Sequence, residues 1–293
     1  MSTRKPRKKN ADYSDTHFPP AARIWETIRN GSRTNREINP WLELYSPSSA
    51  GSVRARSEQT LISARDTIPL LCDLMRSHSR RPIEMRAVQS ACTNENARHA
   101  AEEMARLLTA RGSDKATVHD YHHLYGAVLA TVRETEAAVL EIGLGTNNTD
   151  MVSNMGPAGV PGASLRAFRD FLPRGQVFGA DVDKRILFSE ERIGTSYVDQ
   201  TKPNSFRVLD ANLGGRLFDL VIDDGLHSPN ANIATLTFAL QKLKPGGHAV
   251  MEDIHARSLL IWDLLGMILP RDYVASILQA KEGFLFVVRK AAR

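Results

Sequence analysis

The spacing of apolar residues divides the chain at about residue 137. Before that point, apolar side chains recur every three or four residues, the spacing of one helix face. Three such stripes occur, at Ile24, Trp25 and Ile28, then at Leu61, Ile68, Leu71 and Met75, then at Ala97, Ala101, Met104 and Leu108. We therefore predict a helical region over residues 21–111, interpreted as a cap or dimerisation region, and we expect a homo-oligomer.

From residue 137 onward, short apolar runs alternate with helical patterns, as in α/β proteins with a mainly parallel sheet. The predicted strands are 138–143, 176–181, 205–209, 217–223, 248–252, 273–278 and 284–289, and the predicted helices include 164–172, 230–243 and 258–269. The last two strands are separated only by a turn at residues 281–283, which predicts an antiparallel hairpin. The fold class is α/β, a Rossmann-like seven-stranded sheet with the N-terminal helical region added.

The composition is that of a globular protein. With 293 residues, 42% of them hydrophobic, the chain can bury one sizeable core and a smaller helical appendage. It has no apolar run of the ~18 residues that a membrane span needs, and the first residues lack the apolar segment of a secretory signal. We therefore expect a cytoplasmic protein without a membrane partner. Cys72 and Cys92 are interpreted as reduced structural thiols.

The formal charge of +5 does not indicate a nucleic-acid partner, because it is confined to one end. The basic residues Arg4, Lys5, Arg7, Lys8 and Lys9 together account for +5, so the remaining chain is neutral. A short basic segment of this kind is typical of a solvated tail. We predict a disordered tail over residues 1–20 and no binding of nucleic acid.

A glycine-rich turn follows the first predicted strand. Gly143 and Gly145 would let a ligand approach the backbone closely. The dinucleotide fingerprint requires glycine where this chain has Asn148, and Glu141 would repel a pyrophosphate. Because Glu141 suits a ligand that carries a positive amine, the pattern favours S-adenosylmethionine over NAD.

Acids also end the second and third predicted strands. Asp181 is placed to accept hydrogen bonds from both ribose hydroxyls, and Asp183 two residues later is interpreted as a helix N-terminal acid. Asp210 lies where a carboxylate could accept a hydrogen bond from an adenine amino group. A role in a turn or a helix cap is an equal alternative for Asp210. The predicted cofactor-binding residues are therefore Glu141, Gly143, Gly145, Asp181 and Asp210.

Three further acids end two strands of one strand-helix-strand unit. A right-handed crossover lays these two strands parallel, and Asp224 then comes close to Glu252 and Asp253 if the strands are neighbours. Clustered carboxylates repel one another and need a cation or bound protons. Upstream, the polar and aromatic segment 112–125 is either a surface loop or the rim of a ligand site.

At this point residues 112–293 resemble the class I S-adenosylmethionine-dependent methyltransferases. Within them, Asp223-Asp-Gly-Leu-His227 followed by Glu252-Asp253, with Ser113-Asp-Lys115 and His119-Asp-Tyr121 upstream, resembles the metal-dependent macrocin and mycinamicin type, which acts on antibiotic sugars. The resemblance implies Mg²⁺ held by Asp224, Glu252 and Asp253, His227 as general base, and a small-molecule hydroxyl acceptor, expected to be a sugar of a glycosylated natural product or a saccharide.

Two departures from this pattern and several alternatives accompany the resemblance. Leu226 replaces the usual serine, and the long loop 146–161 leaves the acceptor open. The acids and His227 could be structural, and His255 could support the site or be exposed. The chain could then be a metal-independent methyltransferase of another acceptor or a non-catalytic S-adenosylmethionine-binding protein. An RNA methyltransferase and an NAD-dependent oxidoreductase agree less well with the acidic strand ends and with Asn148.

Overall fold

The computed structural model describes residues 45, 47, 53–78 and 83–292. The predicted tail 1–20 and the stripe at Ile24, Trp25 and Ile28 lie outside these residues. The chain divides into two compact units, residues 1–69 and 70–293. The division falls within helix α2 (Val53–His78), next to Pro69. The boundary predicted at Gly112 therefore does not coincide with it. No helix in the described part of the chain is long and apolar enough to cross a membrane.

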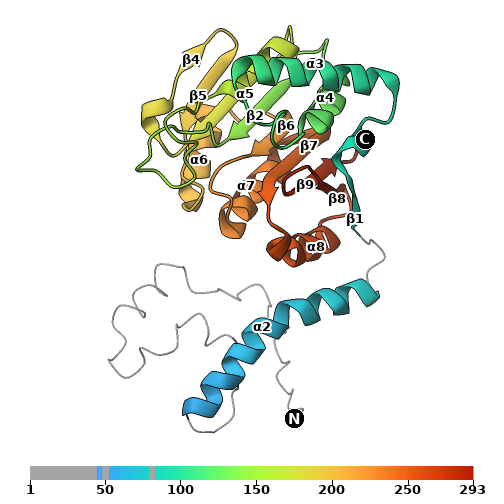
Figure 1. Ribbon diagram of the computed structural model, residues 1–293, viewed down its shortest axis with the longest axis vertical. Helices are drawn as coiled ribbons and strands as arrows, with labels where there is room; N and C mark the ends of the chain where they lie inside the picture. Colours follow the sequence, from blue (N-terminus) through green and yellow to red (C-terminus); the bar gives the residue numbers. More distant parts are fainter. Residues whose placement is uncertain (1–44, 46, 48–52, 79–82, 293) are drawn as a thin grey trace, which may run out of the picture. The chain divides into compact units, whose positions relative to one another are not determined.

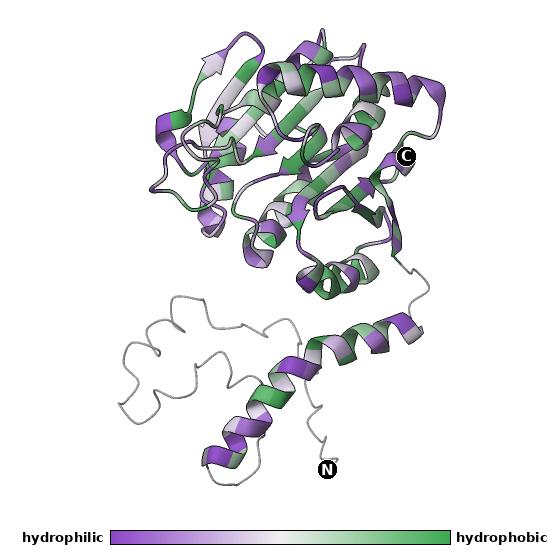
Figure 2. Ribbon diagram, in the orientation of Figure 1, coloured by the Kyte–Doolittle hydropathy of each residue, from purple (hydrophilic) through white to green (hydrophobic). Residues whose placement is uncertain are grey.

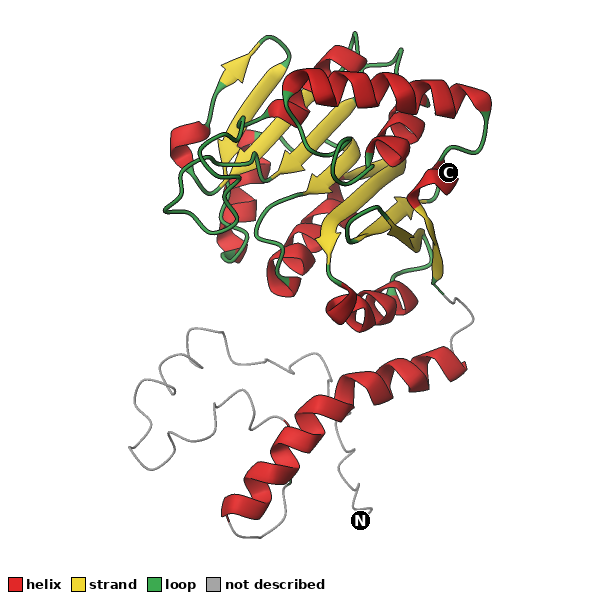
Figure 3. Ribbon diagram, in the orientation of Figure 1, coloured by secondary structure: helices red, strands yellow, loops and turns green. Residues whose placement is uncertain are grey.

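The second unit is built on one sheet, in which nine strands are described, two more than the sequence predicts (Figures 1 and 3). Their order is β1-β8-β9-β7-β6-β2-β3-β5-β4. The strands are β1 (Glu84–Ala87), β2 (Ala138–Ile142), β3 (Gln176–Asp181), β4 (Ser189–Glu190), β5 (Ile193–Tyr197), β6 (Phe218–Asp223), β7 (Leu243–Ile254), β8 (Tyr273–Gln279) and β9 (Phe284–Lys290).

The sheet is mainly parallel. Strands β7, β6, β2, β3 and β5 run parallel, whereas β9 pairs antiparallel with both β7 and β8. The chain builds outward from β2 to β3 and β5, then returns to place β6 and β7 on the other side of β2. The point between β2 and β6 is thus a topological switch point, where open α/β sheets bind ligands at the carboxyl ends of the strands.

Helices cover both faces of this sheet (Figure 1). On one face lie α3 (Glu95–Arg111), α4 (His122–Ala130) and α5 (Ala163–Phe171), and on the other lie α6 (Pro203–Asn212), α7 (Pro229–Lys242) and α8 (Leu259–Ile268). The central strands are strongly hydrophobic (Figure 2), as expected for a sheet buried on both faces.

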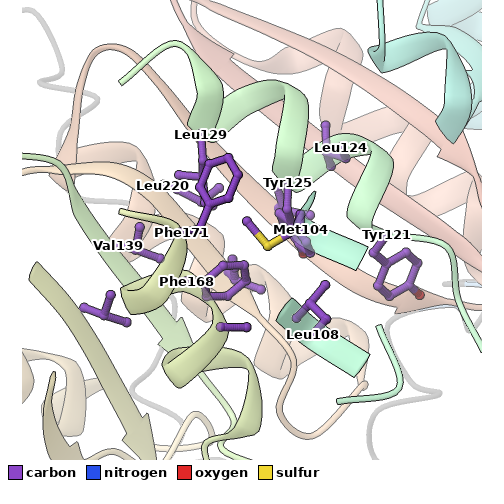
Figure 4. Close-up of a cluster of buried hydrophobic side chains, with 14 of the residues drawn as sticks. Met104, Leu108, Tyr121, Leu124, Tyr125, Leu129, Val139, Phe168, Phe171 and Leu220 are labelled. Atoms are coloured by element: carbon purple, nitrogen blue, oxygen red, sulfur yellow. The ribbon is translucent and has the colours of Figure 1, made fainter. Parts of the chain in front are cut away.

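Helix α3 belongs to the core of the second unit. Met104 and Leu108 on α3 are fully buried beside Tyr125 of α4 and Phe168 of α5 (Figure 4). The rings of Tyr125 and Phe168 meet edge-on with their centroids 5.5 Å apart. Asn94 caps α3 by accepting a hydrogen bond from the Ala97 N–H, and Gly112 ends it in a left-handed conformation. The predicted helical stripe from Ala97 to Leu108 is therefore present, but it packs on the sheet rather than in a separate region.

The predicted strand 205–209 is wrong, because these residues lie in helix α6. Pro203 occupies the first turn of α6, and Phe206 and Leu209, three residues apart, face the core together. The strand at this place in the sheet is β5, whose Gly194, Thr195 and Ser196 interrupt the apolar run that a buried strand usually shows. A strand made mostly of small and polar residues carries little hydrophobic signal.

Candidate active site

A cavity of about 270 Å³ lies at the switch point, along the carboxyl ends of four strands. Gly143 and Gly145 follow β2, Asp181 ends β3, Asp199 follows β5, and Asp224 follows β6; all five line it. Three of these residues, Gly143, Gly145 and Asp181, were predicted to bind the cofactor. Loop 146–161 closes another side through Asp150, Met151, Val152 and Ser153.

Asp181 holds the glycine-rich turn in place. Its Oδ2 accepts a hydrogen bond from the Leu144 N–H at 2.7 Å, and its Oδ1 accepts one from the Asp183 N–H at 2.7 Å. Burial raises the pKa of Asp181, and this effect outweighs the hydrogen bonds from the two N–H groups, which lower the pKa. Each oxygen keeps a further lone pair, so the carboxylate can still accept hydrogen bonds from a ligand in the cavity. Asp183 caps the short helix 184–186, as predicted.

Gly143 must be glycine for two reasons. Its φ is +97°, which side chains rarely adopt, and a Cβ there would collide with the carbonyl oxygen of Asp224. We expect Gly143→Ala to lower the free energy of unfolding by clearly more than Gly214→Ala. Gly214 has a φ of +63° with no atom within 4 Å of an added Cβ, so its substitution should cost only the ~1–2 kcal/mol of left-handed strain.

Urea unfolding of the two variants tests this expectation. Equal losses would mean that the turn after β2 can shift away from β6 without cost.

Asp210 is not at the cavity, and its predicted role is corrected. It lies near the end of helix α6, where its Oδ1 is 2.6 Å from the Lys242 Nζ. Asp199, which follows β5, takes the position that the sequence assigned to Asp210. The sequence did contain a pattern that indicates Asp199, because Tyr197-Val198-Asp199 is also an apolar run that ends in an acid. The polar residues of β5 just before it made this pattern hard to recognise.

Glu141 does not line the cavity either. Side chains alternate between the faces of a strand, and Glu141 shares the face of Val139, which packs under α3, α4 and α5. There it accepts a hydrogen bond from the Ser164 hydroxyl and lies 3.2 Å from the Lys115 Nζ. Its predicted contact with a cofactor amine is not supported by this position, although it belongs to the acid cluster next to the cavity.

The same alternation gathers the acids of three adjacent strands. Ile142, Asp223 and Met251 are in register across β2, β6 and β7, so Gly143, Asp224 and Glu252 follow at one level on the opposite face. Asp223 points the other way and accepts hydrogen bonds from Gln200 and Asn232. The register thus brings Asp224 and Glu252 beside Glu141.

Segment 112–125 covers this acid cluster. The Lys115 Nζ lies 2.5 Å from the Asp224 Oδ2 and also donates to the Glu252 Oε2. The Tyr125 hydroxyl donates to the Glu252 Oε1, and the Tyr121 hydroxyl donates to the Asp253 Oδ1 at 2.6 Å. Of the two readings of this segment, the rim of a ligand site fits these contacts. The sequence predicted no role for Lys115, Tyr121 or Tyr125. The polar and aromatic composition of the segment was the feature that could have indicated one.

His227 lies beside the acids at a second cavity, also of about 270 Å³. Asp224, His227 and Glu252 line this cavity together with His119, Asn154 and Met155. The His227 Nε2 is 3.8 Å from the Asp224 Oδ1 and 3.6 Å from the Asp253 Oδ2. His227 and Asp253 both have a positive φ, +53° and +55°. Such backbone strain in non-glycine residues is typical of functional sites. His255 is exposed and does not line either cavity.

The charges of the cluster are not balanced within the protein. If all four were ionised, the acids Glu141, Asp224, Glu252 and Asp253 would carry four negative charges against one positive charge on Lys115. Burial, together with the neighbouring acids, raises the pKa of Glu252 well above its usual range, although Lys115 opposes this. Burial would also raise the pKa of Asp253, but Tyr121, His227 and His119 lower it overall. Bound protons or a cation must offset the excess negative charge.

The open oxygens of this cluster fit a hard cation. One ligand atom each from Asp224, His227 and Asp253 lies within 4.8 Å of the others, and Asp224 and Asp253 keep an oxygen free of Lys115 and Tyr121. Glu252 is more deeply buried and is held by Lys115 and Tyr125, although its oxygens keep further lone pairs. Carboxylate oxygens are the ligands that Mg²⁺ prefers.

Comparisons with known proteins show which proteins this chain resembles. No family model matches the chain. It is 32% identical over 151 residues to an 8-demethyl-8-alpha-L-rhamnosyl tetracenomycin-C 2'-O-methyltransferase of Streptomyces olivaceus, a match that covers 52% of this chain and 37% of the relative. It is 34% identical over 139 residues to a demethylmacrocin O-methyltransferase of Streptomyces fradiae, covering 47% and 32%. The matched segment thus spans only about a third of these relatives.

Solved structures show the same fold. The MycE methyltransferase of the mycinamycin biosynthetic pathway, in complex with Mg, SAH and mycinamycin VI, superposes with a TM-score of 0.53 at 23% identity, covering 65% of this chain and 54% of MycE. A second crystal form, in complex with Mg and SAH, gives 0.52 at 21% identity, covering 85% and 62%. The predicted resemblance is confirmed: this chain has the fold of class I methyltransferases and is similar, over about half its length, to sugar O-methyltransferases of the tetracenomycin, macrocin and mycinamicin type.

Proposed function

We propose that this chain transfers the methyl group of S-adenosylmethionine to a hydroxyl group on the sugar of a glycosylated small molecule, with Mg²⁺ at the acid cluster. The observation that carries the proposal is the position of Asp224. It lines both cavities, next to Asp253 and His227. A methyl donor in the first cavity and an acceptor in the second would therefore meet at a single group of acids and one imidazole.

The two cavities suit the two substrates. The first is bounded by the glycine turn and by Asp181, which suits a nucleoside whose ribose needs hydrogen-bond acceptors. The second is lined by polar groups, among them Asp114, His119 and Asn154, which suits a hydroxylated ring. Loop 146–161 contributes to both, through Ser153 in each, and Met155 adds an apolar wall on the acceptor side. These residues would hold donor and acceptor in line, which methyl transfer requires.

The residues at the junction would divide the remaining work. Asp224, Glu252 and Asp253 would hold the cation, as the resemblance implies, and when bound it supplies Lewis-acid polarisation of the acceptor hydroxyl. His227 would accept the hydroxyl proton at its Nε2, which faces the same space as Asp224 and Asp253. The acids on the cavity walls would favour a sulfonium and disfavour a phosphate-bearing ligand.

Cofactor binding tests the first half of this proposal. We expect Asp181→Ala to weaken binding of S-adenosylhomocysteine by ~10- to 100-fold, since the loss of hydrogen bonding to a charged group costs roughly 1.5–3 kcal/mol in total. Asp210→Ala is the matched control, because Asp210 pairs with Lys242 away from the cavity. Its affinity should equal that of the wild type.

Calorimetry with S-adenosylhomocysteine, and with NAD as the competing ligand, measures both variants. Binding of NAD but not of S-adenosylhomocysteine would overturn the proposal. A protein that binds S-adenosylhomocysteine but methylates no sugar-bearing acceptor, with or without Mg²⁺, would be a binding protein rather than an enzyme.

A further inference from the structure

Lys115 is a buried ammonium group with three carboxylate partners. Its side chain is only 3% exposed. The Nζ lies 3.2 Å from the Glu141 Oε1 and 2.5 Å from the Asp224 Oδ2, and it also contacts the Glu252 Oε2. The three acids belong to the adjacent strands β2, β6 and β7 or follow them directly. Lys115 thus links the carboxyl ends of three neighbouring strands through ion pairs and hydrogen bonds.

The contacts divide the oxygens of the cluster into two sets. The inner set is bound by Lys115 and comprises the Asp224 Oδ2, the Glu252 Oε2 and the Glu141 Oε1. The outer set faces the His227 Nε2 and comprises the Asp224 Oδ1 and the Asp253 Oδ2. Asp224 belongs to both sets, one oxygen in each. A cation at the outer set therefore shares Asp224 with the ammonium group.

We propose that Lys115 is a positioning residue that occupies an inner cation site, holds Asp224 and Glu252 in place before a divalent cation binds, and competes with that cation for their charge. The inference rests on the proposed Mg²⁺ site and adds a second, built-in cation to it. Carboxylate oxygens of three acids, Asp224, Glu252 and Glu141, lie within 3.2 Å of the Lys115 Nζ, and such contacts favour the charged ammonium group. The carboxylates are therefore held in their binding arrangement before a divalent cation binds, and the affinity for that cation is lower as a result.

The competition has a definite expected sign. Removing the ammonium charge strengthens the attraction of the remaining acids for a divalent cation by roughly 10²-fold or more at the effective dielectric of a protein. Losing the orientation that it gives to the ligands weakens binding by ~10- to 100-fold. Because the cation carries two charges, the electrostatic gain should be larger. Lys115→Met should therefore bind Mn²⁺ about tenfold more tightly than the wild type does.

Mn²⁺ titration of the metal-free full chain, read by the electron paramagnetic resonance of free Mn²⁺, measures this without donor or acceptor. Lys281→Met is the matched control, because Lys281 is exposed and its Nζ donates to the Thr117 carbonyl oxygen at 3.2 Å rather than to an acid of the cluster. It should bind Mn²⁺ as the wild type does. Lys115→Arg keeps the charge and should also retain the wild-type affinity. Unchanged or weaker binding by Lys115→Met would overturn the inference, since a purely structural lysine predicts that result.

A second variant keeps the test decisive if Lys115→Met does not fold. In Lys115→Met/Glu141→Gln the buried charge is removed in a pair, while Asp224, Glu252 and Asp253 remain. It too should bind Mn²⁺ more tightly, because the inner oxygens of Asp224 and Glu252 are released; equal or weaker binding overturns the inference. Tight binding by a Lys115 variant with no binding by the wild type would support the inner site and refute the proposed Mg²⁺ dependence. Equal Mn²⁺ binding by the wild type and the Lys115 variant would support the proposed cation site and refute the role of Lys115.

Discussion

His227→Ala is expected to slow methyl transfer by roughly 10²- to 10⁴-fold, the range that a general base contributes. Binding of S-adenosylhomocysteine and of Mn²⁺ should change little, because His227 does not line the first cavity and because Mg²⁺ and Mn²⁺ prefer carboxylate oxygens to imidazole nitrogen. Single-turnover measurement of methyl transfer to a sugar-bearing acceptor, together with the two binding measurements, separates chemistry from binding.

The control for this variant is His255→Ala. His255 follows β7 only two residues after Asp253, but it is exposed and lines neither cavity. Its substitution should leave the rate of transfer unchanged. The proposal fails for His227 if the variant is as fast as the wild type. If His227→Ala instead loses Mn²⁺ along with activity, His227 is a ligand of the cation with Asp224 and Asp253, and another group takes the proton.

Asp224→Asn is expected to have the second large effect, a loss of roughly 10³-fold in turnover, because Lewis-acid assistance supplies several kcal/mol. The variant keeps the size of the side chain but removes the charge that Lys115 and the cation would share. Activity should no longer depend on Mg²⁺, and Mn²⁺ affinity should fall. Its affinity for S-adenosylhomocysteine should fall much less than its affinity for Mn²⁺, because Asp224 lines the first cavity but its carboxylate is bound by Lys115 and belongs to the proposed cation site.

Asp219→Asn is the matched control on the same strand. The Asp219 Oδ2 accepts hydrogen bonds from the Ala138 N–H and the Lys244 Nζ, both at 2.7 Å, near the amino end of β6. This variant should lose stability without any change in its response to Mg²⁺. Undiminished wild-type activity in EDTA, with Asp224→Asn equally active, would leave a metal-independent methyltransferase with a structural acid cluster.

The strands and helices that could be predicted are those with a strong local signal. Strands β2, β3, β6, β7 and β9 are apolar runs bounded by turns or acids, and α7 begins with Ser228-Pro229. Strand β5 was missed because its residues are mostly small and polar, and its place in the sheet comes from its pairing with β3. The same error moved Asp210 to a strand end and left Asp199 unnoticed.

The sequence by itself determined the α/β class, the glycine turn, Asp181, and the acids and imidazole of the cluster, because each is encoded in a short stretch of residues. Only the tertiary structure decided which oxygens meet. The register of β2, β6 and β7 sets Glu141, Asp224 and Glu252 on one face, and a segment more than a hundred residues before Asp224 brings Lys115 into contact with them. Such contacts depend on strand pairing and on the packing of distant segments, and these leave no local pattern in the chain.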